Sequence, residues 1–315
     1  MDTIKVEPWP MEKPLLWLVG VFSFFVWFAL CISVFGIVYI GLIGVVLFVG
    51  HVVFIAHVKG SGVKLGPDQF PDLHQSVERL ARRMGFDAVP DAYVVQAGGL
   101  LNAMATKLFK SNVIILYSDL LEACGEDTAA RDMIVAHELG HIKEGHLKYL
   151  WFLLPGLFVP FLGSALSRAR EYTCDRYGLA GAGRTEGAMR GLTILAAGAK
   201  RGPQVNLQAM ARQVEDLNSG WLTLGTWLAT HPPLAARMIA LEETLKPAGY
   251  DGSRGLIRAL GIVGAVYVLP TLAMIIVYTF VVMAALNKQR ERNFDFPSAP
   301  AYDSAPEYPG QPSNE

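Results

Sequence analysis

Long uncharged runs alternate with stretches of mixed polarity along the chain. The longest run covers residues 14–58 and has no Asp, Glu, Lys or Arg in 45 positions. As an α-helix it would measure about 67 Å, which is twice the hydrocarbon thickness of a bilayer. The run therefore predicts a hairpin of two membrane-spanning helices, Leu15–Ser33 and Ile37–His57, with a turn near Gly36.

Two more apolar runs follow. Ala259–Leu286 has 28 uncharged residues and predicts a C-terminal transmembrane helix, tilted or kinked at Pro270. Leu150–Leu166 has 17 residues, which is barely enough to cross, and its two prolines and two glycines interrupt a straight helix. Residues 287–315 are rich in proline and poor in aliphatic residues, so we expect a disordered tail there.

The lysines predict on which side of the membrane the domain after the hairpin lies. Lys5 and Lys13 precede the hairpin, Lys59 and Lys64 follow it, and its turn has no charge. Because positive charge favours the cytoplasmic side, residues 1–13 and the domain after the hairpin are expected in the cytoplasm. We therefore expect a multi-pass protein of an inner or plasma membrane.

Residues 59–258 form the aqueous part and mix two periodicities. Alternating patterns predict strands at 92–96, 101–106 and 112–117; helical patterns cover 72–84, a segment from Asp127 past His141, and 168–179, 186–199, 207–217 and 234–245. The predicted fold class is α+β, mainly helical, with a small β-sheet.

Composition excludes several functions. The 27 basic and 28 acidic residues give a net charge of −1, so no basic face for nucleic acid is expected. Three widely spaced cysteines do not make a disulfide framework. The mean hydropathy of +0.33 fits an integral membrane protein with one modest aqueous domain.

The motif that carries chemistry is His137-Glu138-Leu139-Gly140-His141, an HExxH sequence on a predicted helix. Spacing of four residues brings both imidazoles to one helix face, where they can reach a single tetrahedral Zn²⁺. Glu138 then lies beside the metal and can take a proton from water. The alternative is a charged, solvated helix face, but residues 133–136 are apolar, which suits a buried helix.

A catalytic zinc needs a third protein ligand. A continued helix would turn His146 about 140° away from His141, so we expect His146 to be exposed. Glu171 and Asp175 share a helical face, and one can bind the metal while the other orients a histidine. The alternative for these carboxylates is a helix surface paired with Arg168, Arg170 and Arg176.

The order of these motifs resembles a known family. HELGH followed about 30 residues later by ExxxD resembles the gluzincin family of the bacterial membrane protease HtpX and the CAAX prenyl proteases. Residues 101–106 (LNAMAT) resemble the family's NAFA segment, and Thr230-His231-Pro232-Pro233 with Arg237 resembles its "HP…R" element. The resemblance covers about Phe86–Leu241.

The resemblance implies a zincin-type metallopeptidase domain attached to the N-terminal hairpin and the C-terminal span. It implies one Zn²⁺ per chain, held by His137, His141 and Glu171, with Glu138 as general base and Asp175 in support. Its substrate-binding residues would be Asn102, Ala103, Met104 and Ala105, on an edge strand, together with Arg237. His231 would stabilise the oxyanion; the alternative for His231 is an N-cap before a proline-started helix. Cys174 stands where Ala is usual.

A shared zinc constrains the topology. If Leu150–Leu166 crossed the membrane once, Glu171 would lie on the opposite side from His137 and His141. We therefore expect this run to be a re-entrant or membrane-resting flap within the metallopeptidase domain, residues 59–258. Seventeen residues are too few for the helix pair usual in HtpX-like chains, and the active site should lie close to the bilayer.

The sequence thus predicts a membrane-bound zinc endopeptidase. A substrate strand added to the edge at 102–105 favours unfolded or extended polypeptides, which suits membrane protein quality control. One alternative is processing of lipidated CAAX-type peptides, although those enzymes enclose a chamber with more helices. Another is a catalytically silent scaffold with a structural zinc. A channel is disfavoured because the spans contain no Asp, Glu, Lys or Arg.

Overall fold

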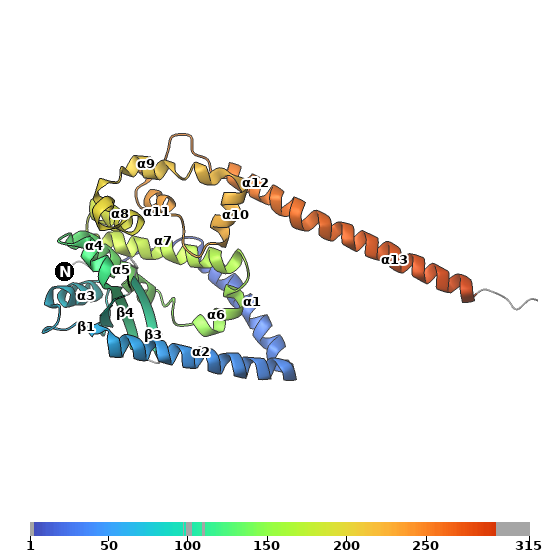
Figure 1. Ribbon diagram of the computed structural model, residues 1–315, viewed down its shortest axis with the longest axis horizontal. Coiled ribbons are helices and arrows are strands. Elements are labelled where there is room, and N and C mark those ends of the chain that lie inside the picture. Colours follow the sequence, from blue (N-terminus) through green and yellow to red (C-terminus); the bar gives the residue numbers. More distant parts are fainter. Residues whose placement is uncertain (1–2, 97, 99–102, 109–110, 294–315) are drawn as a thin grey trace, which may run out of the picture. The chain divides into compact units, whose positions relative to one another are not determined.

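The computed structural model describes residues 3–96, 98, 103–108 and 111–293 (Figure 1). The chain divides into two compact units, Met1–Leu260 and Gly261–Glu315. Unit 1 contains the hairpin, the sheet and most of the helices. The fold class is confirmed: the described chain is mainly helical, with one small mixed sheet.

The helices and strands follow one another in a fixed order. The N-terminal half contains α1 (Glu12–Ile32), α2 (Val34–Ser61), β1 (Val63–Lys64), α3 (Pro71–Arg83), β2 (Asp91–Val95), β3 (Ala103–Leu108), β4 (Ser111–Tyr117), α4 (Ser118–Cys124) and α5 (Thr128–Lys143). The C-terminal half contains α6 (Leu150–Leu157), α7 (Leu162–Ala182), α8 (Thr185–Arg201), α9 (Leu207–Arg212), α10 (Gly220–Leu228), α11 (Leu234–Leu241), α12 (Ser253–Val263), a π-helical turn (Gly264–Val268) and α13 (Leu269–Asn293). Short 3₁₀ turns lie at 202–204, 216–218 and 243–245.

The sheet has the strand order β1-β2-β4-β3. β2 runs parallel to β4, while β1 and β3 run antiparallel to their neighbours. Among the described residues β3 pairs only with β4, with Ala103 opposite Leu116 and Ala105 opposite Ile114, so β3 is an edge strand. The predicted edge position of this segment is therefore confirmed for residues 103–105; Asn102 lies outside the described residues.

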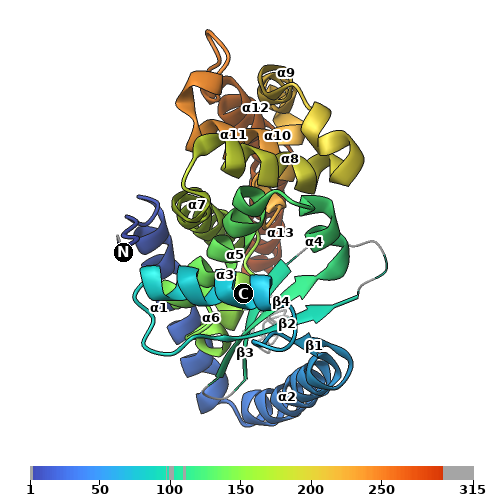
Figure 2. The same ribbon diagram turned by 90° about the vertical axis from the view of Figure 1, so that its left-hand side faces the viewer.

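Alternate residues of the sheet pack on opposite faces, as the two-residue period of a strand requires. Ile114 and Leu116 join the core formed with α3 and α5. Val113 and Ile115 pack on the other face, where Val58 of α2 covers them. Figure 2 shows α2 next to the sheet. The second helix of the hairpin thus rests directly on the sheet that carries the edge strand.

Helices α5 and α7 approach each other very closely (Figure 1). A Cβ at Gly181 would lie 2.3 Å from the Cβ of Ala136, and one at Gly140 would lie 3.1 Å from the ring of Tyr177. At position 181 only glycine permits this separation, whereas at position 140 a Cβ would crowd the ring of Tyr177. The close approach brings the side chains of the HExxH helix and the following ExxxD helix together.

Two apolar helices lie where the sequence predicts the hairpin. Within the described residues, three helices are long and apolar enough to cross a membrane: Glu12–Ile32, Val34–Ser61 and Ser253–Arg290. The two helices of the hairpin are separated at Ser33, whose hydroxyl caps α2 by accepting a hydrogen bond from the backbone N–H of Gly36. This places the turn three residues before the predicted Gly36.

The run Leu150–Leu166 is not one straight helix. α6 has only 8 residues and packs on α1, where Trp27 Nε1 donates to the carbonyl of Phe152 at 2.8 Å. The chain then turns at Phe158–Phe161, with Phe161 at φ 67, and α7 leads to Glu171. This geometry is compatible with the predicted flap; the side of the membrane on which it lies remains a prediction.

In unit 2, α13 continues through Asn293. The predicted start of the disordered tail at Asn287 is therefore wrong, because the charged segment 287–293 extends the helix instead of ending it. Residues 294–315 lie outside the described residues.

Candidate metal centre and active site

Helix α5 positions the HExxH residues. Asp127 is its N-cap, as predicted, and the Asp127 carboxylate accepts a hydrogen bond from the backbone N–H of Ala130 at 3.1 Å. His137 and Glu138 are buried within it. The apolar turn before the motif packs in the core, so the alternative of a solvated helix face is wrong.

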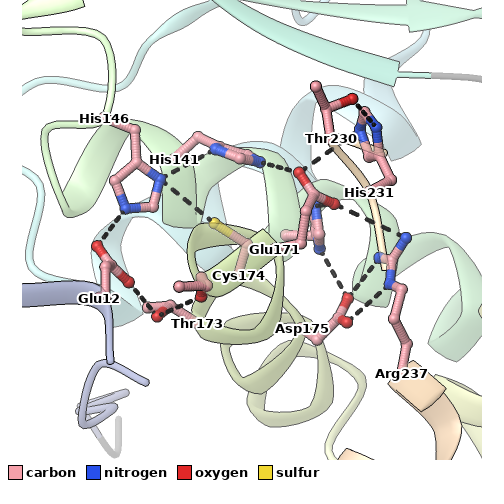
Figure 3. A network of polar contacts seen from close by, with 12 residues as sticks. Glu12, His141, His146, Glu171, Thr173, Cys174, Asp175, Thr230, His231 and Arg237 are labelled. Atoms are coloured by element: carbon pink, nitrogen blue, oxygen red, sulfur yellow. Dashed lines mark hydrogen bonds and ion pairs between the residues drawn. The ribbon is translucent and has the colours of Figure 1, made fainter. Parts of the chain in front are cut away.

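Glu171 of α7 brings a carboxylate to both histidines. Its Oε2 lies 3.5 Å from His137 Nε2. Its Oε1 lies 3.5 Å from His141 Nε2 (Figure 3). Two imidazole nitrogens and one carboxylate facing a common point form a donor set that zinc commonly takes in catalytic sites. The residues present therefore fit a zinc ion.

The other ring nitrogen of His137 is held by Asp175. Nδ1 lies 3.1 Å from Asp175 Oδ1, and Arg237 donates to the same carboxylate from Nε at 2.8 Å and from Nη2 at 2.5 Å. Arg237 Nη1 also lies 3.7 Å from Glu171. Asp175 thus contacts the histidine as expected of a supporting residue, whereas the predicted substrate contact of Arg237 is untested: its buried guanidinium is engaged with these two carboxylates.

The electrostatics of the pocket favour positive charge between these groups. Burial by itself lowers the pKa of His137, but hydrogen bonds to Asp175 and Glu171 raise it to about 10. The pKa of Glu171 is well below its usual value: burial raises it, but the two histidines lower it more. The pKa of Asp175 is also lowered, because Arg237 outweighs the effect of burial. Two ionised carboxylates that stabilise a proton here also stabilise a divalent cation.

The prediction that His146 is exposed is wrong. Gly145 adopts φ +71 and ends α5, and the N–H of His146 then bonds to the carbonyl of His141 at 3.0 Å while that of Gly145 bonds to Ile142. This is a Schellman turn. Because the chain leaves the helix here, His146 returns to the side of His141 instead of pointing away, and it is 5% exposed.

Glu12 and Cys174, which the sequence did not predict as site residues, contact the site through His146. Its Nδ1 lies 3.0 Å from His141 Nδ1, and its Nε2 lies 2.8 Å from Glu12 Oε1. Burial lowers the pKa of His146 to about 4, so the ring is neutral at neutral pH. The second unassigned residue, Cys174, places Sγ 3.7 Å from His146 Nδ1.

Cys174 offers an alternative donor set. Its Sγ and ring nitrogens of His137 and His141 lie within 4.8 Å of one another. We favour Glu171 as the third ligand, because its two oxygens face the Nε2 atoms of both histidines. The thiol contacts His146, which is on the Nδ1 side of His141.

A cavity of about 340 Å³ opens onto the donors. Its walls include Glu138 beside the histidines and Ala103, Met104 and Ala105 of the edge strand. The arrangement brings a carboxylate that can act as a base, the metal donors and a strand edge to one space.

His231 also reaches this cavity. Its side chain is 69% exposed and Nε2 lies 3.6 Å from Glu171 Oε1, while Nδ1 lies 3.1 Å from the hydroxyl of Thr230. The alternative of an N-cap is wrong, because α11 starts at Leu234 with Pro233 at the cap position.

Comparison with known proteins agrees with this geometry. The model of Peptidase family M48 matches residues 67–157 and 148–245, more than half of the chain. The chain is 26% identical to a protease HtpX homolog of Gemmatimonas aurantiaca over 213 residues, covering 55% of this chain and 75% of that protein. It is also 26% identical to the one of Salinibacter ruber over 208 residues, covering 55% and 74%.

A plastoglobule-localized metallopeptidase of Arabidopsis thaliana is 27% identical over 216 residues, covering 61% of this chain and 62% of that protein. No solved structure matches significantly. The fold and the matches define a membrane-attached metallopeptidase of the HtpX-like type. The chain belongs to Peptidase family M48, whose members depend on zinc.

Proposed function

We propose that the chain is a membrane-bound zinc endopeptidase that cleaves unfolded or extended polypeptides. The observation that carries the proposal is the convergence of Glu171 on the Nε2 atoms of His137 and His141, in the cavity that Glu138 also lines. His137, His141 and Glu171 hold one zinc ion per chain. When bound there, zinc supplies an activated water and polarises the scissile carbonyl.

Three protein groups act around the reacting atoms. Glu138 takes the proton of the attacking water and passes it to the leaving amine. His231, exposed at the cavity and adjacent to Glu171, stabilises the developing oxyanion. Asp175 orients His137 and is itself held by Arg237, so we assign Arg237 to the support of the site.

The edge strand β3 determines the substrate class. An extended peptide adds to β3 by backbone hydrogen bonds, beside the small side chains of Ala103 and Ala105. Such recognition depends on extended backbone more than on sequence. We expect Asn102, in the segment before β3, to contribute to the same surface.

The membrane context points to quality control of membrane proteins. The lysines around the hairpin favour a cytoplasmic catalytic domain. α2 packs on the sheet whose edge strand β3 lines the cavity, and α6 packs on α1. Polypeptides in or near the bilayer are the substrates that this position favours.

The test compares wild type with Glu138→Gln, both zinc-loaded in detergent, on casein, with zinc content measured on the same samples. Glu126→Gln, an exposed glutamate before α5, is the matched control. We expect one zinc in each protein and cleavage by wild type and Glu126→Gln only. Zinc without cleavage in all three would favour a scaffold or a lipidated-peptide specialist. Absence of zinc from wild type would contradict the site.

A further inference from the structure

A line of hydrogen bonds leads from His141 to the first residue of α1. His141 Nδ1 lies 3.0 Å from His146 Nδ1, and His146 Nε2 lies 2.8 Å from Oε1 of Glu12. Glu12 is 134 residues away from His146 in the chain, and both side chains are buried. The beginning of a candidate membrane helix therefore contacts the surroundings of a metal donor (Figure 3).

The direction of these hydrogen bonds follows from the chemistry of the rings. An imidazole that binds a metal through Nε2 carries its proton on Nδ1. His141 Nδ1–H must then donate to His146, so Nδ1 of His146 has to be an unprotonated acceptor. With Nδ1 unprotonated, the His146 ring carries its proton on Nε2, which lies 2.8 Å from Glu12 Oε1 and donates to that carboxylate. If His146 Nδ1 were the donor instead, His141 Nδ1 would be the acceptor, and the proton of His141 would be on Nε2, where the metal binds.

Glu12 is itself held in place from α7. The Thr173 hydroxyl donates to Glu12 Oε2, and the backbone N–H of Trp9 donates to that hydroxyl at 2.8 Å. The Trp9 ring stacks on Tyr172 with centroids 4.5 Å apart. The segment before α1 is thus attached to the same helix that supplies Glu171.

We propose that Glu12 and His146 are positioning residues that hold His141 in the tautomer and orientation needed to bind zinc. The inference rests on the zinc site of the proposed function. It assigns a role to a glutamate that lies outside the residues matched by the family model. It also gives α1 a second task besides anchoring, because the start of this helix completes the surroundings of a metal ligand.

The test measures zinc affinity of the full-length protein in detergent by competition with a chromophoric chelator, without any substrate. Two pairs of variants separate hydrogen bonding from bulk. Glu12→Gln keeps an acceptor for His146 and Glu12→Ala does not. His146→Asn keeps an amide oxygen near the position of Nδ1, and His146→Leu does not.

Loss of a partner that orients a metal ligand typically weakens metal binding by about 10- to 100-fold. We expect weakening of this size in Glu12→Ala and His146→Leu. Glu12→Gln should bind zinc at least about threefold more tightly than Glu12→Ala, and His146→Asn at least about threefold more tightly than His146→Leu. The control is Asp132→Asn. Asp132 is a buried carboxylate on α5, the helix that carries His141. Its partners are Ser76 and Arg79, away from the metal donors.

Asp132→Asn should lower the melting temperature and leave zinc affinity within about threefold of wild type. The proposal is overturned if Glu12→Ala and His146→Leu bind zinc as wild type does. It is also overturned if the conservative variants are no better than the others, or if Asp132→Asn weakens binding equally. Should one variant at Glu12 not fold, the pair at His146 decides. If wild type binds zinc but does not cleave casein, the proposed function is contradicted. The comparison of zinc affinities between the variants still tests the role of Glu12 and His146.

Discussion

Gly181 of α7 lies against Ala136 of α5 so closely that a Cβ at position 181 would be 2.3 Å from the Cβ of Ala136. Ala136 immediately precedes His137, and Gly181 is on the helix that carries Glu171. This contact sets the separation of the two helices. The distance between the histidines and Glu171, the third ligand that we propose, therefore depends on a residue that does not touch the proposed metal site.

Gly181→Val should displace α7 from α5. The added side chain has no space, so we expect a lower melting temperature and at least tenfold weaker zinc binding. Gly225→Ala is the control, since a Cβ at that exposed position on α10 meets nothing within 4 Å. It should be neutral or slightly stabilising. Wild-type zinc affinity in Gly181→Val would contradict this account of the helix contact.

Asp175 and Arg237 form a buried ion pair with two hydrogen bonds. Replacing either partner alone leaves a buried charge without its partner, which costs about 3–5 kcal/mol. Asp175→Asn and Arg237→Leu should therefore each lower the free energy of unfolding, and the double variant should cost less than their sum. Denaturant unfolding in detergent measures this, and additive effects would show that the pair does not act as a unit.

Much of the site could be predicted from local patterns. HExxH fixes two donors by helical spacing, and Glu171 and Asp175 share a face because they are four residues apart. The prediction failed for His146 because it assumed a continuous helix, although Gly145 was available as a signal of the helix end.

Long-range contacts could not be predicted in the same way. No local pattern connects Glu12 with His146 or Arg237 with Asp175, because these contacts arise only when distant helices pack together. The short strand β1 and the helix α10 were also not predicted. β1 has two residues, too few for a periodicity, and α10 lies in an apolar segment without a clear polar face.

Glu171 and Cys174 should differ sharply in their effect on zinc. Glu171→Ala removes the carboxylate that faces both Nε2 atoms, and we expect at least tenfold weaker zinc binding. Cys174→Ala should still bind one zinc ion and cleave casein, because the thiol contacts His146 instead of the common point of the donors. Atomic absorption after dialysis measures both. If Cys174→Ala loses zinc and Glu171→Ala does not, Cys174 is the third ligand and Glu171 is not.

The thiol of Cys124 should be unreactive in the folded protein. Burial, with a smaller contribution from Asp127, raises its pKa from 9.0 to about 12. A raised pKa lowers the thiolate fraction by about a thousandfold at pH 8, and the thiolate is the reactive form. In a Cys31→Ser, Cys174→Ala background, a thiol-specific chromogenic reagent should label Cys124 only after unfolding. Rapid labelling at pH 8 without denaturant would contradict the buried environment.

Strand addition at β3 predicts a broad cleavage profile. Peptide libraries should be cut at many sequences, with preferences of a few-fold that reflect the small side chains of Ala103 and Ala105. Reduced, unfolded proteins should be cleaved faster than their folded forms. Mass spectrometry of the products gives both results, and tight specificity for one sequence would rule out recognition through extended backbone.

The most direct test of the central claim is X-ray absorption at the zinc edge of the loaded full-length protein. If His137, His141 and Glu171 hold the ion, the nearest shell contains only nitrogen and oxygen at about 2.0–2.2 Å, with the outer-shell pattern of two imidazoles. A sulfur atom at about 2.3 Å would contradict the account, because it would identify Cys174 as a ligand.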